Sequence, residues 1–251
     1  MPRGIETFRE WFKGEEDHYV IIGGTACELL FDRADFDFRT TKDIDLVLIV
    51  EALDAAFGRK FWPYVRKAGY EHCSRSTGEV QFYRFTHPKI EDYPVMIELF
   101  ARRQETIQLP PDAVLTPIPM NESVSSLSAI LLNDSYYDFL KSGRDSVSGI
   151  TVLDADHIIP FKAKAWLDLS ERKARGEAVD SRDIKKHKND IFRLSMLINL
   201  NIRIQTPSDI LEDLTDFISQ MENEEVNLKQ IGVPDKTKEQ VLREIREHYI
   251  P

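Results

Sequence analysis

Hydrophobic and polar positions are spaced differently in the two parts of the chain, and the spacing predicts two kinds of structure. Up to about residue 155, short apolar runs alternate with segments of helical spacing, as strands and helices do in a sheet-containing domain. The strands expected there are residues 18–22, 43–50, 70–75, 80–86, 94–100, 126–134 and 149–154, and the helices are residues 5–17, 25–32, 53–68 and 135–143. From residue 156 onward only helical spacing remains, with helices expected at residues 160–174, 181–200, 207–222 and 237–248.

The order of these elements predicts the fold class and the domain boundary. Strands and helices that give way to helices alone indicate an α+β chain, in which a mixed β-sheet flanked by helices precedes a helical domain. The change of pattern places the α/β domain at residues 1–153 and the helical domain at residues 154–251. No internal repeat or low-complexity segment interrupts this plan.

Composition and charge narrow the classes of function. The chain is 42% hydrophobic and 30% charged, as ordinary soluble proteins are, and it has no apolar stretch of membrane-spanning length. The first residues lack the apolar core of a signal peptide, and Cys27 and Cys73 lie in no metal-ligand spacing, so a cytoplasmic location is expected. A net charge of −10 argues against general binding to nucleic acid, although "SRDIKKHKND" is a local basic patch.

Two glycines stand where the first strand is expected to become a helix, in "YVIIGGTACELLF". Glycine there lets the backbone approach a ligand, and the N-terminus of the following helix offers N–H groups to a phosphate. Gly23 and Gly24 are therefore candidate phosphate-binding residues, and Thr25 either caps the helix or gives a hydroxyl to a phosphate oxygen. Read alone, the pair also fits a plain tight turn. The spacing excludes a P-loop.

Carboxylates follow on two later strands. Asp43 and Asp45 project from the same side of their strand, and two like charges repel unless a cation or hydrogen-bond donors lie between them. Glu98 lies among apolar positions of a further strand, where an acid is costly unless it is paired or bound to a metal. The alternatives are a solvated strand end and an ion pair with an arginine such as Arg102. Together the three acids predict a site for Mg²⁺ or Mn²⁺ and for nucleotidyl or phosphoryl transfer.

In this order, "GGTA", "RTTKDIDL" and "MIEL" resemble the nucleotidyltransferase fold of the DNA polymerase β superfamily. The arginine and threonine before D-I-D, together with "FKAKAWLDLSERK" and "DSRDIKKHKNDIFRL", make the chain similar to the AbiEii/AbiGii toxin family. The resemblance implies that Asp43, Asp45 and Glu98 are catalytic and hold the metal. It implies a nucleotide-binding set of Gly23, Gly24, Thr25, Arg39, Thr40, Lys162, Lys164, Asp183, Lys186, His187 and Asp190. The insertion "DRADFDF" departs from the family pattern and enlarges the loop between the glycines and the carboxylates.

The residues of the helical part have alternative interpretations. Asp183, His187 and Asp190 recur at helical spacing and share one stripe, which fits either a polar cleft or a solvated helix with a Lys186–Asp190 pair. The two lysines of "IIPFKAKAW" lie in a mostly apolar run, so one of them is expected to face a polar cavity. The alternative is that both extend to solvent.

The expected activity is that of a metal-dependent nucleotidyltransferase. Mg²⁺ or Mn²⁺ would be the cofactor, and ATP or another nucleoside triphosphate would supply NMP to an unknown acceptor: a tRNA, a protein or a small molecule. The resemblance includes a role as the toxin of a toxin–antitoxin or phage-abortive-infection system, with a cognate antitoxin protein as a partner and no membrane. The alternatives are a non-catalytic nucleotide- or protein-binding member of the same fold and a metal-dependent phosphodiesterase.

Overall fold

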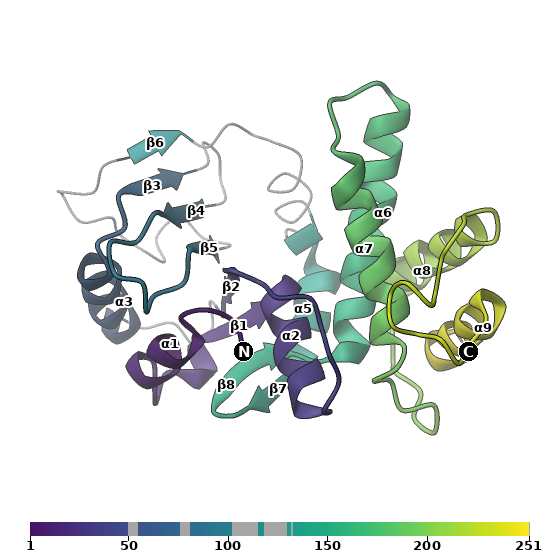
Figure 1. The fold of residues 1–251 in the computed structure, drawn as a ribbon, viewed down its shortest axis with the longest axis horizontal. Helices are drawn as coiled ribbons and strands as arrows, with labels where there is room; N and C mark the ends of the chain where they lie inside the picture. Colours follow the sequence, from purple (N-terminus) through teal and green to yellow (C-terminus); the bar gives the residue numbers. More distant parts are fainter. Residues whose placement is uncertain (50–54, 76–80, 102–114, 118–129, 132, 251) are drawn as a thin grey trace. The chain divides into compact units, whose positions relative to one another are not determined.

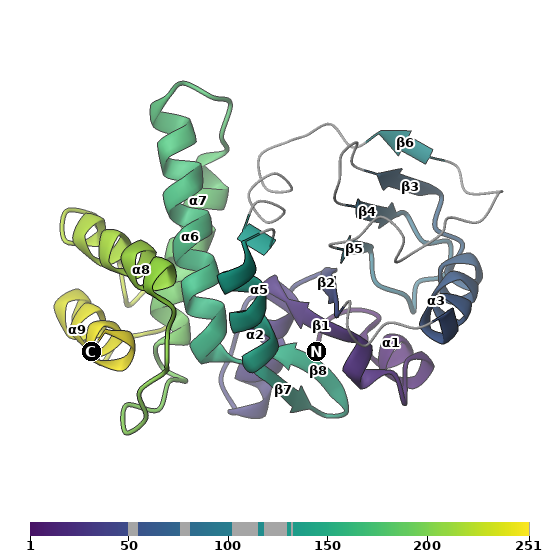
Figure 2. The same cartoon turned by 180° about the vertical axis from the view of Figure 1, so that it is seen from behind.

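The computed structural model describes residues 1–49, 55–75, 81–101, 115–117, 130–131 and 133–250 (Figures 1 and 2). The chain forms two compact units, and each is made of two separate segments. The first unit is Met1–Asn121 with Arg144–Asp154, and the second is Glu122–Gly143 with Ala155–Pro251. The sequence pattern divided the chain once, between residues 153 and 154. The structure also divides the chain close to that point, between Asp154 and Ala155. In addition, the earlier segment Glu122–Gly143 belongs to the second unit.

The first unit is built on one mixed sheet of eight strands in the order β6-β3-β4-β5-β2-β1-β8-β7 (Figure 1). The strands are β1 (Tyr19–Ile22), β2 (Asp43–Leu48), β3 (His72–Arg75), β4 (Gln81–Thr86), β5 (Met96–Ala101), β6 (Leu115–Pro117), β7 (Arg144–Val147) and β8 (Ile150–Leu153). The pairs β2–β5, β1–β8 and β3–β6 are parallel, and the other neighbours are antiparallel. The α+β class with a helix-flanked mixed sheet is therefore confirmed.

Aromatic side chains attach two helices to one face of this sheet. The helices are α1 (Ile5–Trp11) and α3 (Ala55–Ala68). The ring of Phe8 meets Tyr19 of β1 edge-on at 5.3 Å, and that of Phe61 meets Phe85 of β4 at 5.7 Å. All four side chains are almost completely buried. Because side chains alternate along a strand, Asp43 and Asp45 project from the opposite face.

The helix α2 (Gly23–Arg33) directly follows β1 and packs against β1, β2 and β7. It begins at Gly23, two residues before the start expected from the sequence. The first helix is shorter than residues 5–17, because it ends at Trp11 and Gly14 follows with a φ of 84°. A 3₁₀ turn, Glu16–His18, leads from there into β1.

The strand expected at residues 126–134 is wrong where the structure describes it. Ile130 and Leu131 are helical, and Asn133 caps α5 (Asp134–Ser142) by accepting a hydrogen bond from the N–H of Tyr136 at 3.1 Å. A short apolar run can be either a turn of buried helix or a strand. Here Asn133 is a favourable N-cap residue, so the chain forms a helix. Residues 126–129 and 132 lie outside the described part of the chain.

The described helices of the second unit after α5 are α6 (Ala155–Ala174), α7 (Ser181–Leu194), α8 (Ser208–Met221) and α9 (Lys238–Tyr249). Helix α6 packs on α7 and α8, and α8 packs on α9. The edge-to-face contact of Trp166 with Phe217, 5.5 Å between ring centroids, lies in the α6–α8 interface. The described helices include none with the length and apolar character that a membrane span requires.

The end of α7 differs from the sequence prediction, and the end of α9 makes contacts that the sequence did not predict. Helix α7 ends at Leu194 and not at residue 200, because the Ser195 hydroxyl donates to the carbonyl of Phe192 and tight turns follow. At the C-terminal end, the Tyr249 hydroxyl donates to the carbonyl of Asp156 at 2.5 Å, and His248 Nε2 lies 2.9 Å from the Asp156 carboxylate. These contacts hold α9 against the start of α6.

Candidate functional site

Strand pairing brings the predicted carboxylates onto neighbouring strands of the first unit. Asp45 on β2 is in register with Glu98 on β5, and Glu98 is in register with Arg84 on β4. Residues paired in this way share a face of the sheet, so one row of charged side chains crosses three strands. Asp43 stands on the same face, two residues before Asp45. All three carboxylates are half-buried.

The start of α2 lies directly beside this row. Gly23 has a φ of +69°, a conformation that glycine adopts without penalty, and a Cβ built on it would come within 1.9 Å of Asp45 Oδ2. The carboxylate therefore occupies the space that a side chain at this position would need. Gly23 is required on both counts, for its backbone conformation and for the room that it leaves to Asp45.

Arg39 reaches the same helix start from the loop before β2. A Cβ on Gly24 would lie 3.2 Å from Nη2 and 3.5 Å from Nη1 of Arg39, and 2.8 Å from Cγ2 of Thr41. The Arg39 guanidinium also lies 5.3 Å from the centre of the Phe38 ring. A positive group and the N-terminus of a helix are thus adjacent, and both favour an anion.

Hydrogen bonds between α2 and the residues before β2 fix this arrangement. Glu28 accepts from the N–H of Thr41 at 2.7 Å and from its hydroxyl at 2.6 Å. The Thr25 hydroxyl donates to the carbonyl of Asp43 at 2.5 Å. Glu28, Thr25 and Thr41 are all buried. Together these bonds hold Thr41 and the backbone at Asp43 against α2.

The structure gives Thr25 a different place from the one expected. It lies inside α2, which has Ile22 as its N-cap residue without a side-chain hydrogen bond, so Thr25 does not cap the helix. Its buried hydroxyl is bonded to the chain and joins the helix to β2. The neighbouring Thr40, also predicted to bind nucleotide, is exposed.

Glu98 is held by an arginine that the sequence interpretation missed. Arg84 donates from Nε to Glu98 Oε1 at 2.6 Å, and its Nη2 contacts the same oxygen. The interpretation named Arg102 as the possible partner, but that residue lies outside the described part of the chain. The available signal was the antiparallel pairing of residues 80–86 with 94–100, because it brings an arginine opposite the acid.

The donor set of the carboxylate row suits a hard cation. Two half-buried aspartates from one strand offer oxygen ligands, and Mg²⁺ is commonly held by one or two carboxylates together with substrate phosphates. Within the described residues, no group of three His, Cys, Asp or Glu side chains is arranged to hold a metal ion. Asp43 and Asp45 are ligands of the type that this cation prefers, while Glu98 is engaged with Arg84.

Three of the six predicted residues of the helical unit take part in ion pairs. Lys162 donates to Asp190 Oδ2 at 2.8 Å, and both side chains are almost fully buried, with exposed fractions of 6% and 2%. Lys164 donates to Asp213 at 2.6 Å and is 39% exposed. Asp183 and His187 are half-buried and Lys186 is exposed on α7. That these residues join the carboxylates in one nucleotide site stays a prediction.

Lys164 faces a polar pocket of about 280 Å³ within the helical unit. The described residues that line it are Ile130, Asn133, Tyr136, Lys164, Asp168, Asp209, Glu212 and Asp213. The Tyr136 hydroxyl donates to Asp213 Oδ2 at 2.9 Å, so this aspartate is shared by a lysine and a tyrosine.

Comparisons with models of known families, with curated proteins and with solved structures found no match for this chain. The chemical interpretation therefore depends on the residues themselves. In the first unit they place a helix N-terminus, an arginine and two aspartates close together. An anion and the cation that accompanies it can bind together at such a site.

Proposed function

We propose that the protein is a metal-dependent nucleotidyltransferase that transfers NMP from a nucleoside triphosphate to an acceptor hydroxyl. The observation that carries the proposal is the contact of Asp45 with Gly23, because it brings a cation-binding carboxylate to the phosphate-binding end of α2. Asp43 on the same face and Arg39 beside Gly24 add the second carboxylate and a positive charge. The resemblance of "GGTA", "RTTKDIDL" and "MIEL" to nucleotidyltransferases supports the same function.

In this proposal each residue has a defined task. The N–H groups at the start of α2 and the Arg39 guanidinium bind the triphosphate, and Asp43 and Asp45 hold Mg²⁺ or Mn²⁺. The bound metal supplies Lewis-acid stabilisation of the phosphate charge. Glu98 accepts the proton of the acceptor hydroxyl, whose oxygen forms a bond to the α-phosphorus. The bond from that phosphorus to the bridging oxygen breaks, and pyrophosphate leaves with the electron pair.

The helical unit is assigned a supporting role by the same resemblance. Lys164, Asp183, Lys186 and His187 would contact the nucleotide or place the acceptor. Lys162 and Asp190 are buried against each other, so in this proposal they hold α6 and α7 together and do not touch the nucleotide. The acceptor is a tRNA, a protein or a small molecule, and a toxin role with a cognate antitoxin follows from the family that the chain resembles.

One observation favours a second candidate, a nucleotide-binding protein without transfer activity. Glu98 is bound to Arg84, and the described acids do not form a three-ligand metal group. A site of this kind would bind nucleotide through Gly23, Gly24 and Arg39 and leave the α-phosphate intact.

One experiment distinguishes the two candidates. The protein is incubated with Mg²⁺ and each α-labelled nucleoside triphosphate, together with total RNA or cell lysate, and the label is then located. Transfer is expected in the unmodified chain and not in Asp43→Asn or Asp45→Asn, whereas Asp92→Asn, an exposed acid of the same unit, serves as the control. Nucleotide binding without transfer would establish the second candidate. Absence of binding would exclude both.

A further inference from the structure

The helical unit contains a second pocket, of about 410 Å³, between α6, α7 and the end of α8. The residues that line it are Trp166, Ser170, Lys173, Ser181, Ile184, Lys185, Lys188, Gln220 and Glu224. Its volume is that of a small-molecule site. None of these residues belongs to the proposed nucleotide-binding set. Helical geometry places Lys185 and Lys188 on a different side of α7 from Asp183, His187 and Asp190.

The lining of this pocket is positively charged in an acidic chain. It contains three lysines and one glutamate, a net charge of +2, whereas the whole chain has −10. Lys188 donates to Glu224 at 2.5 Å and to the carbonyl of Glu225 at 3.0 Å. Lys173 donates to the hydroxyl of Ser181. Lys185 is exposed and makes no ion pair among the described residues. Two of the three lysines thus have no carboxylate within ion-pair distance in the described chain.

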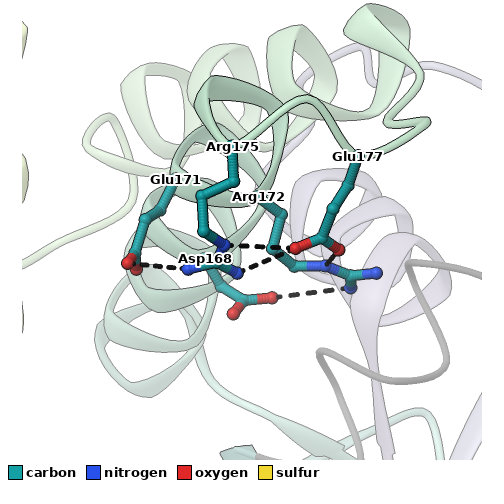
Figure 3. A network of polar contacts seen from close by, with 5 residues as sticks. All are labelled: Asp168, Glu171, Arg172, Arg175 and Glu177. Carbon is teal, nitrogen blue, oxygen red and sulfur yellow. Dashed lines mark hydrogen bonds and ion pairs between the residues drawn. The ribbon is translucent and has the colours of Figure 1, made fainter.

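The acids near this pocket are neutralised mainly by arginines. Figure 3 shows the network at the end of α6, in which Arg172 and Arg175 hold Glu177 and Arg175 also holds Glu171. Hydrogen bonds from Arg172 and Arg175 lower the pKa of Glu177. In the same way Arg182 lowers the pKa of Asp180, with a smaller contribution from Lys173. These acids therefore do not neutralise Lys173 and Lys185, whose positive charges remain available to a ligand in the pocket.

Trp166 contributes an aromatic ring to the lining of this pocket. Its side chain is 4% exposed, and its Nε1–H has no hydrogen-bond partner in the part of the chain that the structure describes. A buried indole N–H normally has an acceptor. Here that N–H is closed off from solvent, so the ring gives the pocket an apolar surface and no donor.

We propose that this pocket binds the phosphate group of a small phosphorylated molecule. Phosphate oxygens are acceptors only, and they match the ammonium groups of Lys173 and Lys185 and the serine hydroxyls that line the pocket. Ser181 is the first residue of α7, and the Asp180 carboxylate before it caps that helix by accepting from the N–H of Arg182, so the phosphate is held by the lysines and hydroxyls. The site does not depend on the nucleotidyltransferase proposal, because it shares no residue with that site.

Equilibrium dialysis of the full chain with labelled inorganic phosphate and with glycerol 3-phosphate tests the proposal. Chelator is present to remove divalent metals, and ionic strength is kept constant. Saturable binding is expected, and Lys185→Ala should weaken it roughly tenfold, the effect of losing one charge-assisted hydrogen bond. Lys185→Glu should abolish it. Lys229→Ala removes an exposed lysine of the same unit outside the pocket and should leave binding unchanged.

The outcomes separate this site from the others. Binding that survives in Asp45→Asn and Gly24→Val but falls in Lys185→Ala supports the pocket, whatever the fate of the nucleotidyltransferase proposal. Equal affinity of Lys185→Ala and the unmodified chain would overturn it. Binding of a single-stranded RNA oligonucleotide, with no binding of either small phosphate, would also overturn it.

Discussion

Asp45 occupies the space into which a side chain on Gly23 would project, with Oδ2 within 1.9 Å of the position of a Cβ. A backbone conformation and a carboxylate position are thereby coupled at the start of α2. A substitution at Gly23 must displace the acid, the helix start or both. This coupling can be measured without knowledge of the substrate.

We expect Gly23→Ala to lower the free energy of unfolding by more than the cost of its positive φ. Gly14→Ala is the matched control, because Gly14 also has positive φ and nothing lies within 4 Å of its Cβ position. The control should lose about 1 kcal/mol, the usual cost of a left-handed residue with a side chain. Urea unfolding measures both. Equal losses would show that Asp45 moves aside freely.

Arg39→Ala should weaken nucleoside triphosphate binding roughly tenfold, because a charge-assisted contact at the start of α2 is lost. Arg59→Ala removes an exposed arginine of α3 and should have no such effect. Isothermal titration with a non-hydrolysable triphosphate and Mg²⁺ measures the affinity. An unchanged affinity in Arg39→Ala would remove the arginine from the proposed site.

Arg84 and Glu98 should show a coupling energy of about 1–3 kcal/mol in a double-mutant cycle of Arg84→Met and Glu98→Gln. The two side chains are only 21% and 14% exposed, so removing the arginine leaves an acid with little water around it. Denaturation of the single and double variants gives the coupling. A value near zero would mean that the pair is not formed in solution.

Lys162→Met should lower the free energy of unfolding by about 3–5 kcal/mol, because it leaves Asp190 as a buried charge without its lysine. The double variant Lys162→Met with Asp190→Leu should recover much of that loss. Lys164→Met is the control, since the Lys164–Asp213 pair is more exposed. If Lys162→Met lowers the free energy of unfolding no more than Lys164→Met does, burial does not make the Lys162–Asp190 pair more important for stability than the more exposed pair.

Stability should fall at alkaline pH because burial raises the pKa of Tyr19, Tyr64, Tyr70 and Tyr136. Above about pH 10 the unfolded chain loses these phenolic protons and the folded chain retains them. The free energy of unfolding therefore decreases as pH rises. Tyr136→Phe should make the loss shallower. Tyrosinate absorbance that appears before unfolding, as judged by circular dichroism, would contradict this prediction.

Sequence patterns found the elements whose signals are local. The glycines that begin α2, the acids of β2 and the strand–strand–strand order β3, β4, β5 follow from residue spacing. The strand β7 was not predicted, because its own residues have no apolar alternation and only the turn after it indicates a hairpin. In that turn Ser148 and Gly149 both have positive φ, as a two-residue hairpin requires. Residue spacing does not reveal tertiary partners. It therefore does not place Arg84 beside Glu98, and it predicts either a helix cap or a phosphate contact for the Thr25 hydroxyl, which the structure bonds to the Asp43 carbonyl.

The interrupted order of the two units has a consequence during protein synthesis. The inner strand β1 pairs on one side with β8, through Ile21 and Val152, and the segment between them includes α5 of the other unit. About 130 residues separate the two partners, and a ribosome needs on the order of ten seconds to add them. Until then β1 presents an unpaired edge made of buried apolar residues. Such an edge attracts other strands, so the nascent chain passes through an aggregation-prone interval that the finished protein does not have.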